Sequence, residues 1–408
     1  MTLLFVFPYV PWPLDRGTFQ RTYHLLREMA RTHTIDFVAL DENGESTPHL
    51  PLFEAFCREV EFIPFVHPPW SRLFPDRLLE PLPANVTHWR SPALAAAIDR
   101  RVAEKTYDLI HITDIVMAPY VLKHRDKVPF VMDRSRVDLQ FQLMEHRTLK
   151  FPWRTRILRC EAYLKLWLFE RKVARRTALE IVCGPDDETF LRRHVSAAMP
   201  IAVMVNGVNL EYFRPEAVPD PHDEKPTVIF CGAMDYNPNI DALDWYFREI
   251  HALVLAGVPE LRVLIVGKNP VPAVQACASL PGVTVTGSVP DVRPCYRRAW
   301  VQMVPLRIGG GTRLKIVESL AMDIPVVSTT IGAQGLDLVH DENILLADSP
   351  ADFAAQLIRG LTDPALRERL RAAGQTTVHA RFGWPAIVQP LARRYEDLPR
   401  RAGSPASL

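Results

Sequence analysis

The segment from residue 301 to residue 334, VQMVPLRIGGGTRLKIVESLAMDIPVVSTTIGAQ, restricts the fold more than any other part of the chain. An apolar run at 301–305 and a second β-rich run at 324–328 enclose a stretch, 312–322, whose apolar residues recur with the period of a helix. Three consecutive glycines separate the first run from the helical stretch. This order of strand, loop, helix and strand predicts a unit of a parallel sheet, and therefore an α/β fold.

The glycine loop of this unit has the features of an anion site. Gly310 and Gly311 let the backbone come close to a ligand, and Thr312 is a natural N-cap for the helix that follows. Arg313 and Lys315 stand where acidic residues would complement the helix dipole, which costs about 0.3–1 kcal/mol per charge unless a bound anion offsets it. An ordinary βαβ turn with exposed basic side chains explains the same spacing, so both interpretations stay open.

Glu318 lies three residues after Lys315, so the two side chains share one face of the predicted helix. This spacing would set a cation for a phosphate beside a carboxylate for sugar hydroxyls. The run GGGTRLKIVESLA followed by PVVSTTIGAQGL resembles the donor-site signature of the glycogen-synthase-like group of retaining glycosyltransferases, which have the GT-B fold. The resemblance, strongest over residues 227–384, implies two Rossmann-like domains that face each other across a cleft.

One residue departs from the pattern of the resembled family. Its members carry a Glu-x7-Glu pair here, and Glu318 matches the second glutamate, whereas Gly310 occupies the position of the first. The GGGTRLK form is a common variant of the motif. It leaves open which residue contacts the sugar hydroxyls that the first glutamate would hold.

The resemblance implies transfer of a sugar from a nucleoside diphosphate to a hydroxyl acceptor with retention of configuration. In this family a donor phosphate oxygen takes the acceptor proton, so no protein base is needed. Arg313 and Lys315 would act as catalytic residues by stabilising the leaving diphosphate, and Glu318 would bind donor hydroxyls. The nucleoside diphosphate sugar would be a co-substrate, with no other cofactor. The sequence contains no D-x-D motif, so we expect no dependence on metal.

Further donor contacts are expected after other strands of this domain. A strand at 227–231 precedes GAMDYNPN, where the family often has a glycine-rich turn with an arginine and a lysine for the diphosphate. Because both cations are absent here, Arg313 and Lys315 become the leading phosphate ligands. The variant turn resembles a subgroup associated with bacterial surface-polysaccharide loci. The resemblance implies donor contacts at four more positions: Gly232, Asn237, Gly267 and Val289.

The start of the chain predicts another strand, helix and strand, at 3–7, 18–31 and 35–40. Gly17 stands at the mouth of the predicted helix. In the resembled family the loop after the first strand approaches the donor phosphates and the acceptor, which makes Gly17 a candidate donor contact. A plain helix-start glycine fits the pattern equally well.

Polar residues follow two further predicted strands, at 108–112 and 128–132. Asp114 comes just after the first strand and Asp133 directly after the second, where ligands of open α/β sheets bind. The resembled family often has a histidine at the end of the second strand, where it touches the transferred sugar. We therefore predict Asp133 as a catalytic residue that contacts the sugar or the acceptor, unless the assignment is shifted by one strand.

A basic and aromatic stretch covers residues 134–176. It holds twelve Lys or Arg against four Asp or Glu, interleaved with aromatic residues that include Phe151, Trp153, Tyr163, Trp167 and Phe169. Such a stretch could lie on an anionic membrane surface and meet a lipid-linked acceptor. It could equally be a long helix with its apolar face packed on the domain and its basic face in water.

At 408 residues the chain exceeds what a single core usually supports, so two domains are expected. We expect an N-terminal acceptor-side domain at 1–212, a proline-rich linker at 213–226 and a C-terminal nucleotide-sugar-binding domain at 227–384. The resemblance implies that a last helix, at 385–402, joins the N-terminal domain.

Composition favours a globular enzyme over a nucleic-acid binder, because the net charge is +1 and 48% of residues are hydrophobic. The six cysteines show no C-x-x-C spacing, and the N-terminus lacks the basic region of a signal peptide. We therefore expect a cytoplasmic protein, with peripheral contact at the inner face of the cell membrane through residues 134–176 as one alternative. No nucleic-acid partner is expected.

Two other function classes stay open. A GT-B-fold epimerase or phosphorylase would use the same nucleotide or phosphate site. A non-catalytic nucleotide-sugar-binding partner would account for the missing first glutamate and the missing cation pair.

Overall fold

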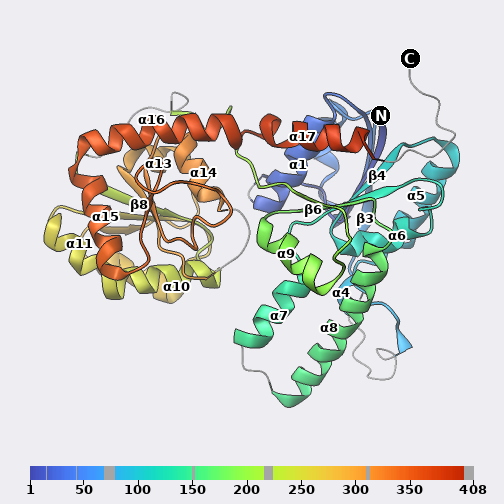
Figure 1. Ribbon diagram of the computed structural model, residues 1–408, viewed down its shortest axis with the longest axis horizontal. Helices are drawn as coiled ribbons and strands as arrows, with labels where there is room; N and C mark the ends of the chain where they lie inside the picture. Colours follow the sequence, from blue (N-terminus) through green and yellow to red (C-terminus); the bar gives the residue numbers. More distant parts are fainter. Residues whose placement is uncertain are drawn as a thin grey trace. The chain divides into compact units, whose positions relative to one another are not determined.

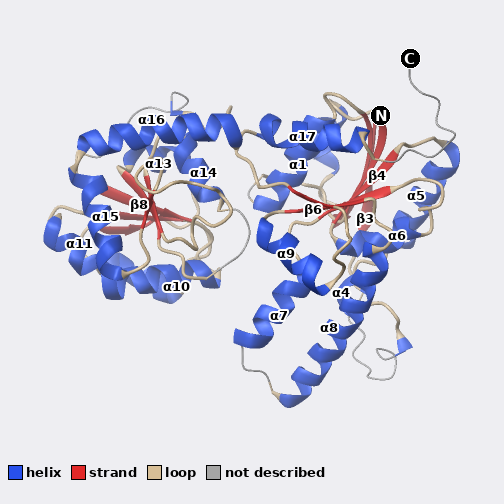
Figure 2. Ribbon diagram, viewed as in Figure 1, coloured by secondary structure: helices blue, strands red, loops and turns tan. Residues whose placement is uncertain are grey.

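The computed structural model describes residues 1–14, 16–42, 44–68, 79–148, 152–215, 224–308 and 313–398. The chain divides into two compact units: unit 1 comprises Met1–Met204 with Val388–Leu408, and unit 2 comprises Val205–Ile387. The boundaries expected from the sequence were residues 212 and 384. Each unit is a parallel sheet with helices on both faces (Figures 1 and 2).

The sheet of unit 1 has seven strands in the order β3-β2-β1-β4-β5-β6-β7, and every neighbouring pair is parallel. Most of these strands are continuous apolar runs because helices cover both faces of the sheet. The strands are β1 (Thr2–Phe7), β2 (Thr34–Glu42), β3 (Glu59–Phe65), β4 (Leu109–Thr113), β5 (Phe130–Asp133), β6 (Leu179–Val182) and β7 (Ile201–Val203).

The helices of unit 1 connect these strands in the order expected for parallel pairing. They are α1 (Gly17–Met29), α2 (Leu50–Glu54), α4 (Ala84–Thr87), α5 (Pro92–Glu104), α6 (Ala118–Leu122), α7 (Asp138–Thr148), α8 (Trp153–Ala174) and α9 (Pro185–His194). Figure 1 shows α7 and α8 extending away from the sheet of this unit.

A buried ion-pair group anchors α8 to the sheet. Arg134, after β5, donates two hydrogen bonds to Glu170 of α8, at 2.9 and 2.6 Å, and one to Glu180 of β6, at 2.8 Å. All three side chains are at most 1% exposed. Arg134 therefore does not belong to a solvated basic face, and removing one partner would leave a buried charge uncompensated.

The last helix, α17 (Trp384–Glu396), begins in unit 2 and ends in unit 1. In unit 1 the hydroxyl of Tyr395 lies 2.7 Å from Nδ1 of His111 in β4, and both residues are fully buried. Arg394 donates a 3.0 Å hydrogen bond to the carbonyl of Ile201 in β7. The second half of α17 is thus part of the packing of the first unit.

The sheet of unit 2 has six parallel strands in the order β10-β9-β8-β11-β12-β13. They are β8 (Thr227–Cys231), β9 (Arg262–Val266), β10 (Val283–Val285), β11 (Val301–Val304), β12 (Val326–Ser328) and β13 (Leu345–Leu346). The helices are α10 (Asn237–Trp245), α11 (His251–Gly257), α12 (Pro272–Ala276), α13 (Arg293–Arg298), α14 (Leu314–Ala321), α15 (Pro350–Thr362) and α16 (Pro364–Arg381).

The predicted strand, helix and strand at the glycine loop are confirmed as β11, α14 and β12. β11 and β12 pair in parallel, with Gln302 opposite Val326. The α14 residues Ile316, Val317 and Leu320 are buried in the core of unit 2, as the helical spacing predicted.

Within the described ranges, none of the helices combines the length and the apolar character that a membrane span requires.

Candidate functional site

The strand order of unit 2 places a ligand site at one edge of its sheet. The order reverses between β8 and β11, because the chain runs outward to β9 and β10 on one side and to β12 and β13 on the other. In open parallel sheets ligands bind beyond the carboxyl ends of the strands at this switch point. The loop that leaves β11 here includes the predicted donor contacts Gly310, Gly311 and Thr312, which lie outside the described residues.

Glycines bring the backbone loops together at this edge. A Cβ atom added to Gly267, after β9, would lie 1.6 Å from the carbonyl oxygen of Gly232, after β8. Gly267 in turn donates a 3.1 Å hydrogen bond to the carbonyl of Gly287, in the loop that carries Val289. Three of the predicted donor contacts, Gly232, Gly267 and Val289, therefore belong to adjoining loops after β8, β9 and β10.

Lys315 lies at the centre of this arrangement. Its Nζ donates a 2.8 Å hydrogen bond to Oδ1 of Asn239 and lies 4.2 Å from the centroid of the Phe230 ring. A Cβ atom added to Gly232 would lie 3.2 Å from the same Nζ. Among the residues that the structure describes, no carboxylate forms an ion pair with Lys315, and desolvation lowers the pKa of its ammonium to about 7.

Asn239 of α10 holds Lys315 in place. It is 5% exposed, and its Nδ2 donates a 2.8 Å hydrogen bond to the carbonyl of Ala233, so its Oδ1 is turned toward the ammonium. The sequence motif GAMDYNPN contains this residue, but the predicted contact was Asn237. The structure places Asn237 at the exposed start of α10, whereas Asn239 packs inward two positions later.

Glu318 lies one turn after Lys315 on α14. Its Oε2 accepts a 3.1 Å hydrogen bond from the hydroxyl of Tyr296 in α13, and desolvation raises the pKa of its carboxyl to about 7. Lys315 and Glu318 both keep part of their surface exposed, although protein surrounds their charged ends. They offer a ligand one hydrogen-bond donor and one acceptor that water solvates poorly.

Arg313 occupies the N-cap position of α14, which was predicted for Thr312, and its side chain is partly buried. Desolvation lowers the pKa of its guanidinium, as it does that of the Lys315 ammonium, and the charge of Arg313 further lowers the pKa of Lys315. Two neighbouring cations, both poorly solvated, are the electrostatic setting that an anion would stabilise. The roles predicted for Arg313, Lys315 and Glu318 remain predictions.

The residues predicted in unit 1 form a separate group. Gly17 is the first residue of α1, and Arg21, one turn later, donates hydrogen bonds of 2.6 and 3.1 Å to the carboxylate of Asp133. Arg21 also donates a 2.6 Å bond to the carbonyl of Met204. Both charged side chains are at most 1% exposed. A sugar contact by Asp133 stays a prediction, and it would require this ion pair to open.

Asp114, one residue beyond β4, has an unusual backbone conformation. Its backbone has φ 61° and ψ 158°, a region that glycine normally occupies. Its carboxylate accepts hydrogen bonds from the amide of Ser135, at 3.0 Å, and from its hydroxyl, at 2.9 and 3.0 Å. Burial, and then the nearby Asp138, raise the pKa of this carboxyl to about 7. Sequence position alone drew attention to Asp114, and nothing in the sequence indicated its backbone strain.

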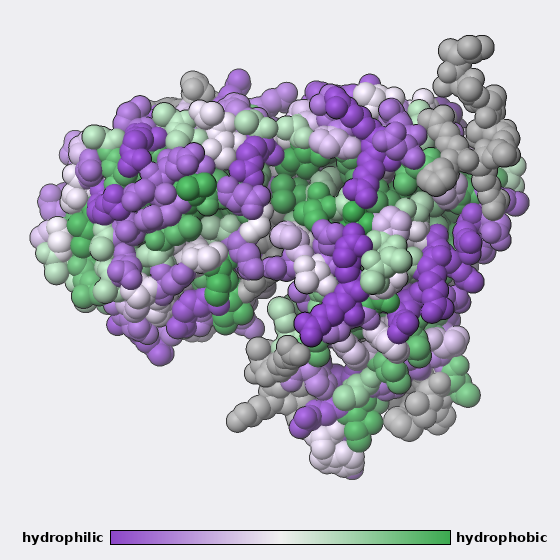
Figure 3. Space-filling view, in the orientation of Figure 1, coloured by the Kyte–Doolittle hydropathy of each residue, from purple (hydrophilic) through white to green (hydrophobic). Residues whose placement is uncertain are grey.

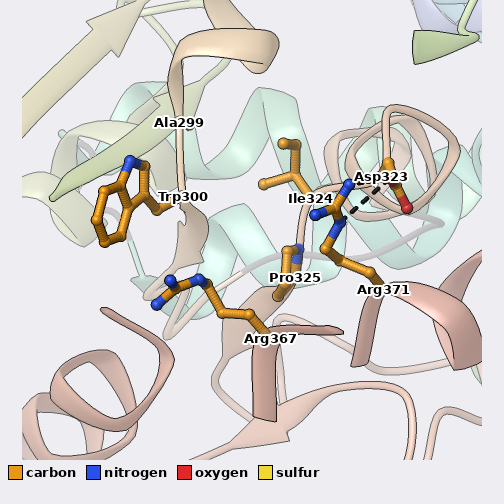
Figure 4. A pocket seen from close by; sticks show the side chains of 7 residues that line it. All are labelled: Ala299, Trp300, Asp323, Ile324, Pro325, Arg367 and Arg371. Atoms are coloured by element: carbon orange, nitrogen blue, oxygen red, sulfur yellow. Dashed lines mark hydrogen bonds and ion pairs between the residues drawn. The ribbon is translucent and has the colours of Figure 1, made fainter. Parts of the chain in front are cut away.

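A cavity of about 230 Å³ in unit 2 lies elsewhere. Trp300 precedes β11 and Pro325 precedes β12, so the cavity opens at the amino ends of these strands. Figure 4 shows Arg371 directed at Asp323 and Arg367 below Trp300. This cavity therefore does not belong to the predicted donor site, which lies beyond the carboxyl ends of the strands. The part of the chain that the structure describes contains no group of three or more His, Cys, Asp or Glu that could hold a metal ion.

Comparison with protein families and curated proteins gives a family match within unit 2. Residues 225–363 match the family model described as glycosyl transferases group 1. A curated relative, an uncharacterized 44.6 kDa protein in the cps region of Klebsiella pneumoniae, is 26% identical over 139 residues, which are 32% of this chain and 36% of the relative. A second, D-inositol 3-phosphate glycosyltransferase of Thermomonospora curvata, is 40% identical over 103 residues, which are 24% of this chain and 23% of the relative. The chain thus spans about a third and about a quarter of these relatives.

Solved structures match the fold over nearly the whole chain. Sucrose-phosphate synthase from Thermosynechococcus elongatus has a TM-score of 0.68 at 20% identity, covering 98% of this chain and 99% of that one. The Anabaena protein HepE, crystallised with UDP and glucose, has a TM-score of 0.63 at 15% identity, covering 98% and 100%. The chain therefore has the GT-B fold, and residues 225–363 of its second unit match the model of glycosyl transferases group 1.

Proposed function

We propose that the chain is a retaining, hexosyltransferase-type glycosyltransferase that moves a sugar from a nucleoside diphosphate to a hydroxyl acceptor. The observation that carries this proposal is the pair Lys315 and Glu318, which stands at the switch point of unit 2 with an ammonium that no carboxylate of the described residues neutralises. The group 1 domain and the presence of UDP and glucose in the HepE structure support it.

The charges fit the electron flow of this reaction. The bond between the sugar C1 and the diphosphate oxygen breaks, and the bond from the acceptor oxygen to C1 forms on the same face. The acceptor proton passes to the released phosphate oxygen. Negative charge therefore grows on the diphosphate, where the Lys315 ammonium and the Arg313 guanidinium would stabilise the transition state more than the ground state. Glu318 would accept hydrogen bonds from donor hydroxyls.

We propose that the acceptor hydroxyl binds at the carboxyl ends of the strands in unit 1, next to Asp114. The strand order there reverses between β1 and β4, and Asp114 follows β4 directly. Ser135 fixes its carboxylate by hydrogen bonds, and its backbone is strained. Strained backbone residues of this kind cluster at ligand-binding and active sites. A hydroxyl could donate a hydrogen bond to this carboxylate.

A role in surface-polysaccharide or glycoconjugate biosynthesis is supported by the likeness to the Klebsiella pneumoniae protein from a cps region. We also propose a cytoplasmic location, for which the six free cysteines are the supporting observation.

The test is incubation with a panel of nucleoside diphosphate sugars and hydroxyl acceptors, followed by NMR of the product's anomeric centre. We expect a product whose configuration equals that of the donor, and loss of product in Glu318→Gln. Inversion would refute the retaining mechanism. Conversion of the donor alone, or only with free phosphate, would identify an epimerase or a phosphorylase. Nucleotide binding without turnover across the panel would identify a non-catalytic partner.

A further inference from the structure

Helix α8 has apolar side chains on two opposite faces. Leu166, Phe169 and Val173 are buried against the rest of unit 1, as expected for a helix packed on a domain. Four large apolar side chains of the other face, called here the exposed stripe, remain in solvent: Trp153, Ile157, Leu164 and Leu168, at 67%, 53%, 54% and 55% exposed. The two interpretations of this stretch left open by the sequence differ in what the outer face carries, and the outer face is not simply basic.

The spacing shows that the exposed stripe is one continuous surface. Its members follow one another at intervals of four, seven and four residues, close to whole helical turns, so they project from the same side of α8. They span about 22 Å along the helix at a rise of about 1.5 Å per residue. Single exposed apolar residues need no explanation, but an aligned row of this length marks an interaction surface. Figure 3 shows hydrophobic residues beside hydrophilic ones over this helix.

The exposed stripe ends in a basic cavity. A depression of about 350 Å³ is lined by the last stripe residue, Leu168, by Trp167 and by four cations, Arg171, Lys172, Arg175 and Arg176. Trp167 donates a 2.8 Å hydrogen bond to the carbonyl of His194, which fixes its ring, and the guanidinium of Arg171 lies 4.8 Å from the ring centroid. Every charged residue that lines this depression is basic.

The acidic residues of α8 do not neutralise this end. Glu161 forms an ion pair with Lys165, at 2.7 Å, and Glu170 is buried with Arg134. An apolar row that leads into a cluster of cations is complementary to a surface that offers acyl chains beside phosphate groups. A nucleic acid would use the cations without the apolar row, and a protein partner would not need four cations around one depression.

We propose that α8 docks unit 1 on the surface of an anionic phospholipid bilayer. The exposed stripe enters the boundary between headgroups and acyl chains, and a lipid phosphate occupies the basic cavity. This inference goes beyond the proposed glycosyl transfer, because it assigns a partner to a surface that takes no part in donor binding. It does not depend on that activity.

The chain carries its own reporter for the test. Cys160 lies between Ile157 and Leu164 on the same side of α8, and it is the exposed one of the six cysteines. An environment-sensitive fluorophore is attached to Cys160 after Cys277→Ser and Cys295→Ser remove the two partly exposed thiols. The labelled protein, without donor or acceptor, is mixed with phosphatidylcholine vesicles that contain or lack phosphatidylglycerol.

We expect a blue shift and co-sedimentation only with the phosphatidylglycerol vesicles. Ile157→Gln with Leu164→Gln should weaken binding at least about tenfold, because apolar area no longer enters the bilayer. Arg171→Gln with Arg175→Gln should weaken it about tenfold and reduce its salt dependence. Two control pairs should bind like the parent protein: the exposed cations Arg125→Gln with Lys127→Gln, and the exposed apolar residues Leu253→Gln with Val339→Gln. Thermal unfolding checks that each variant remains folded.

Three results would overturn the proposal. One is the lack of any shift or sedimentation with phosphatidylglycerol vesicles at low ionic strength. Another is an equal loss of binding in the control pairs. The third is a dimer in analytical ultracentrifugation that the stripe variant dissociates, which would show that a second copy of the chain covers α8. Failure of glycosyl transfer would leave the vesicle result standing, so the two proposals can fail separately.

Discussion

Replacing Lys315 by methionine, which keeps most of the side-chain volume, tests whether its ammonium is held ready for an anion. Desolvation lowers the pKa of Lys315 from its usual 10.5 to about 7. Below pH 7 the folded protein carries the full cost of this desolvated charge, which is bounded by about 5 kcal/mol. Between pH 7 and pH 10.5 the unfolded chain holds the proton and the folded chain does not, so this cost shrinks as the pH rises.

We therefore expect Lys315→Met to gain stability relative to the parent protein at pH 6, and to lose about 3 kcal/mol of that relative gain by pH 9. The hydrogen bond to Asn239 is lost at both pH values, so it cancels from the comparison. The measurement is urea unfolding of both proteins at the two pH values. Lys127→Met, which removes an exposed lysine of unit 1, serves as the control and should show no such difference.

Ligand binding should show the complementary pH dependence. A bound diphosphate restores the charge of Lys315, so the affinity for a nucleoside diphosphate sugar should be constant below pH 7 and fall up to about tenfold per pH unit above it. The phosphates of such a sugar do not titrate in this range. Calorimetric titration of the parent protein and of Lys315→Met gives both profiles. Equal stability differences at pH 6 and pH 9, together with a pH-independent affinity, would refute the anion-site argument.

Three further predictions concern single residues. Because desolvation raises the pKa of Glu318 from 4.5 to about 7, the folded state loses stability as the pH rises from 4.5 to 7, where the unfolded chain is already ionised. Glu318→Gln should therefore be more stable than the parent by about 3 kcal/mol at pH 8 but nearly equal at pH 4, and a constant difference in urea unfolding would contradict this. Asp133→Asn leaves the buried Arg21 uncompensated, so the free energy of unfolding should fall by about 3–5 kcal/mol, and an unchanged midpoint would show that the ion pair is dispensable. Gly267→Ala should lower the free energy of unfolding by about 1–3 kcal/mol or more, because the added Cβ meets the carbonyl of Gly232. Gly184→Ala, which has open space around it, should lower it little, and thermal unfolding of both variants checks this.

The local pattern was sufficient to predict the elements around the glycine loop. Apolar spacing gave the strand, helix and strand of β11, α14 and β12, because each element buries a face whose period is written in adjacent residues. The i and i+3 spacing of Lys315 and Glu318 gave their shared face for the same reason. The fold class followed from this unit and from the resemblance, and the solved structures agree with it.

The partners of these side chains could not be predicted, because they lie far away in sequence. Tyr296 reaches Glu318 from α13, and Asn239 reaches Lys315 from α10, 76 positions earlier. Two asparagines stand two positions apart in GAMDYNPN, and only the direction in which α10 starts decides which one turns inward.

The sequence also did not allow us to predict which charged residues are buried in ion pairs. Arg134 was counted with a basic stretch, but its carboxylate partners, Glu170 and Glu180, stand 36 and 46 positions further on. Composition cannot distinguish an arginine of this kind from the exposed Arg175. Asp133 was assigned to a ligand on position alone, and its ion pair with Arg21 depends on a contact across 112 positions.

Because α17 crosses from unit 2 into unit 1, the first unit cannot be cut from the gene as one continuous piece. A fragment that stops at Met204 would lack Tyr395, leaving a hole beside His111 and an imidazole nitrogen without its hydroxyl. A chimaera that exchanges unit 1 should therefore carry two stretches together, the first 204 residues and the segment from Val388 onward. For the same reason, unit 1 can complete its packing during synthesis only after α17 has left the ribosome.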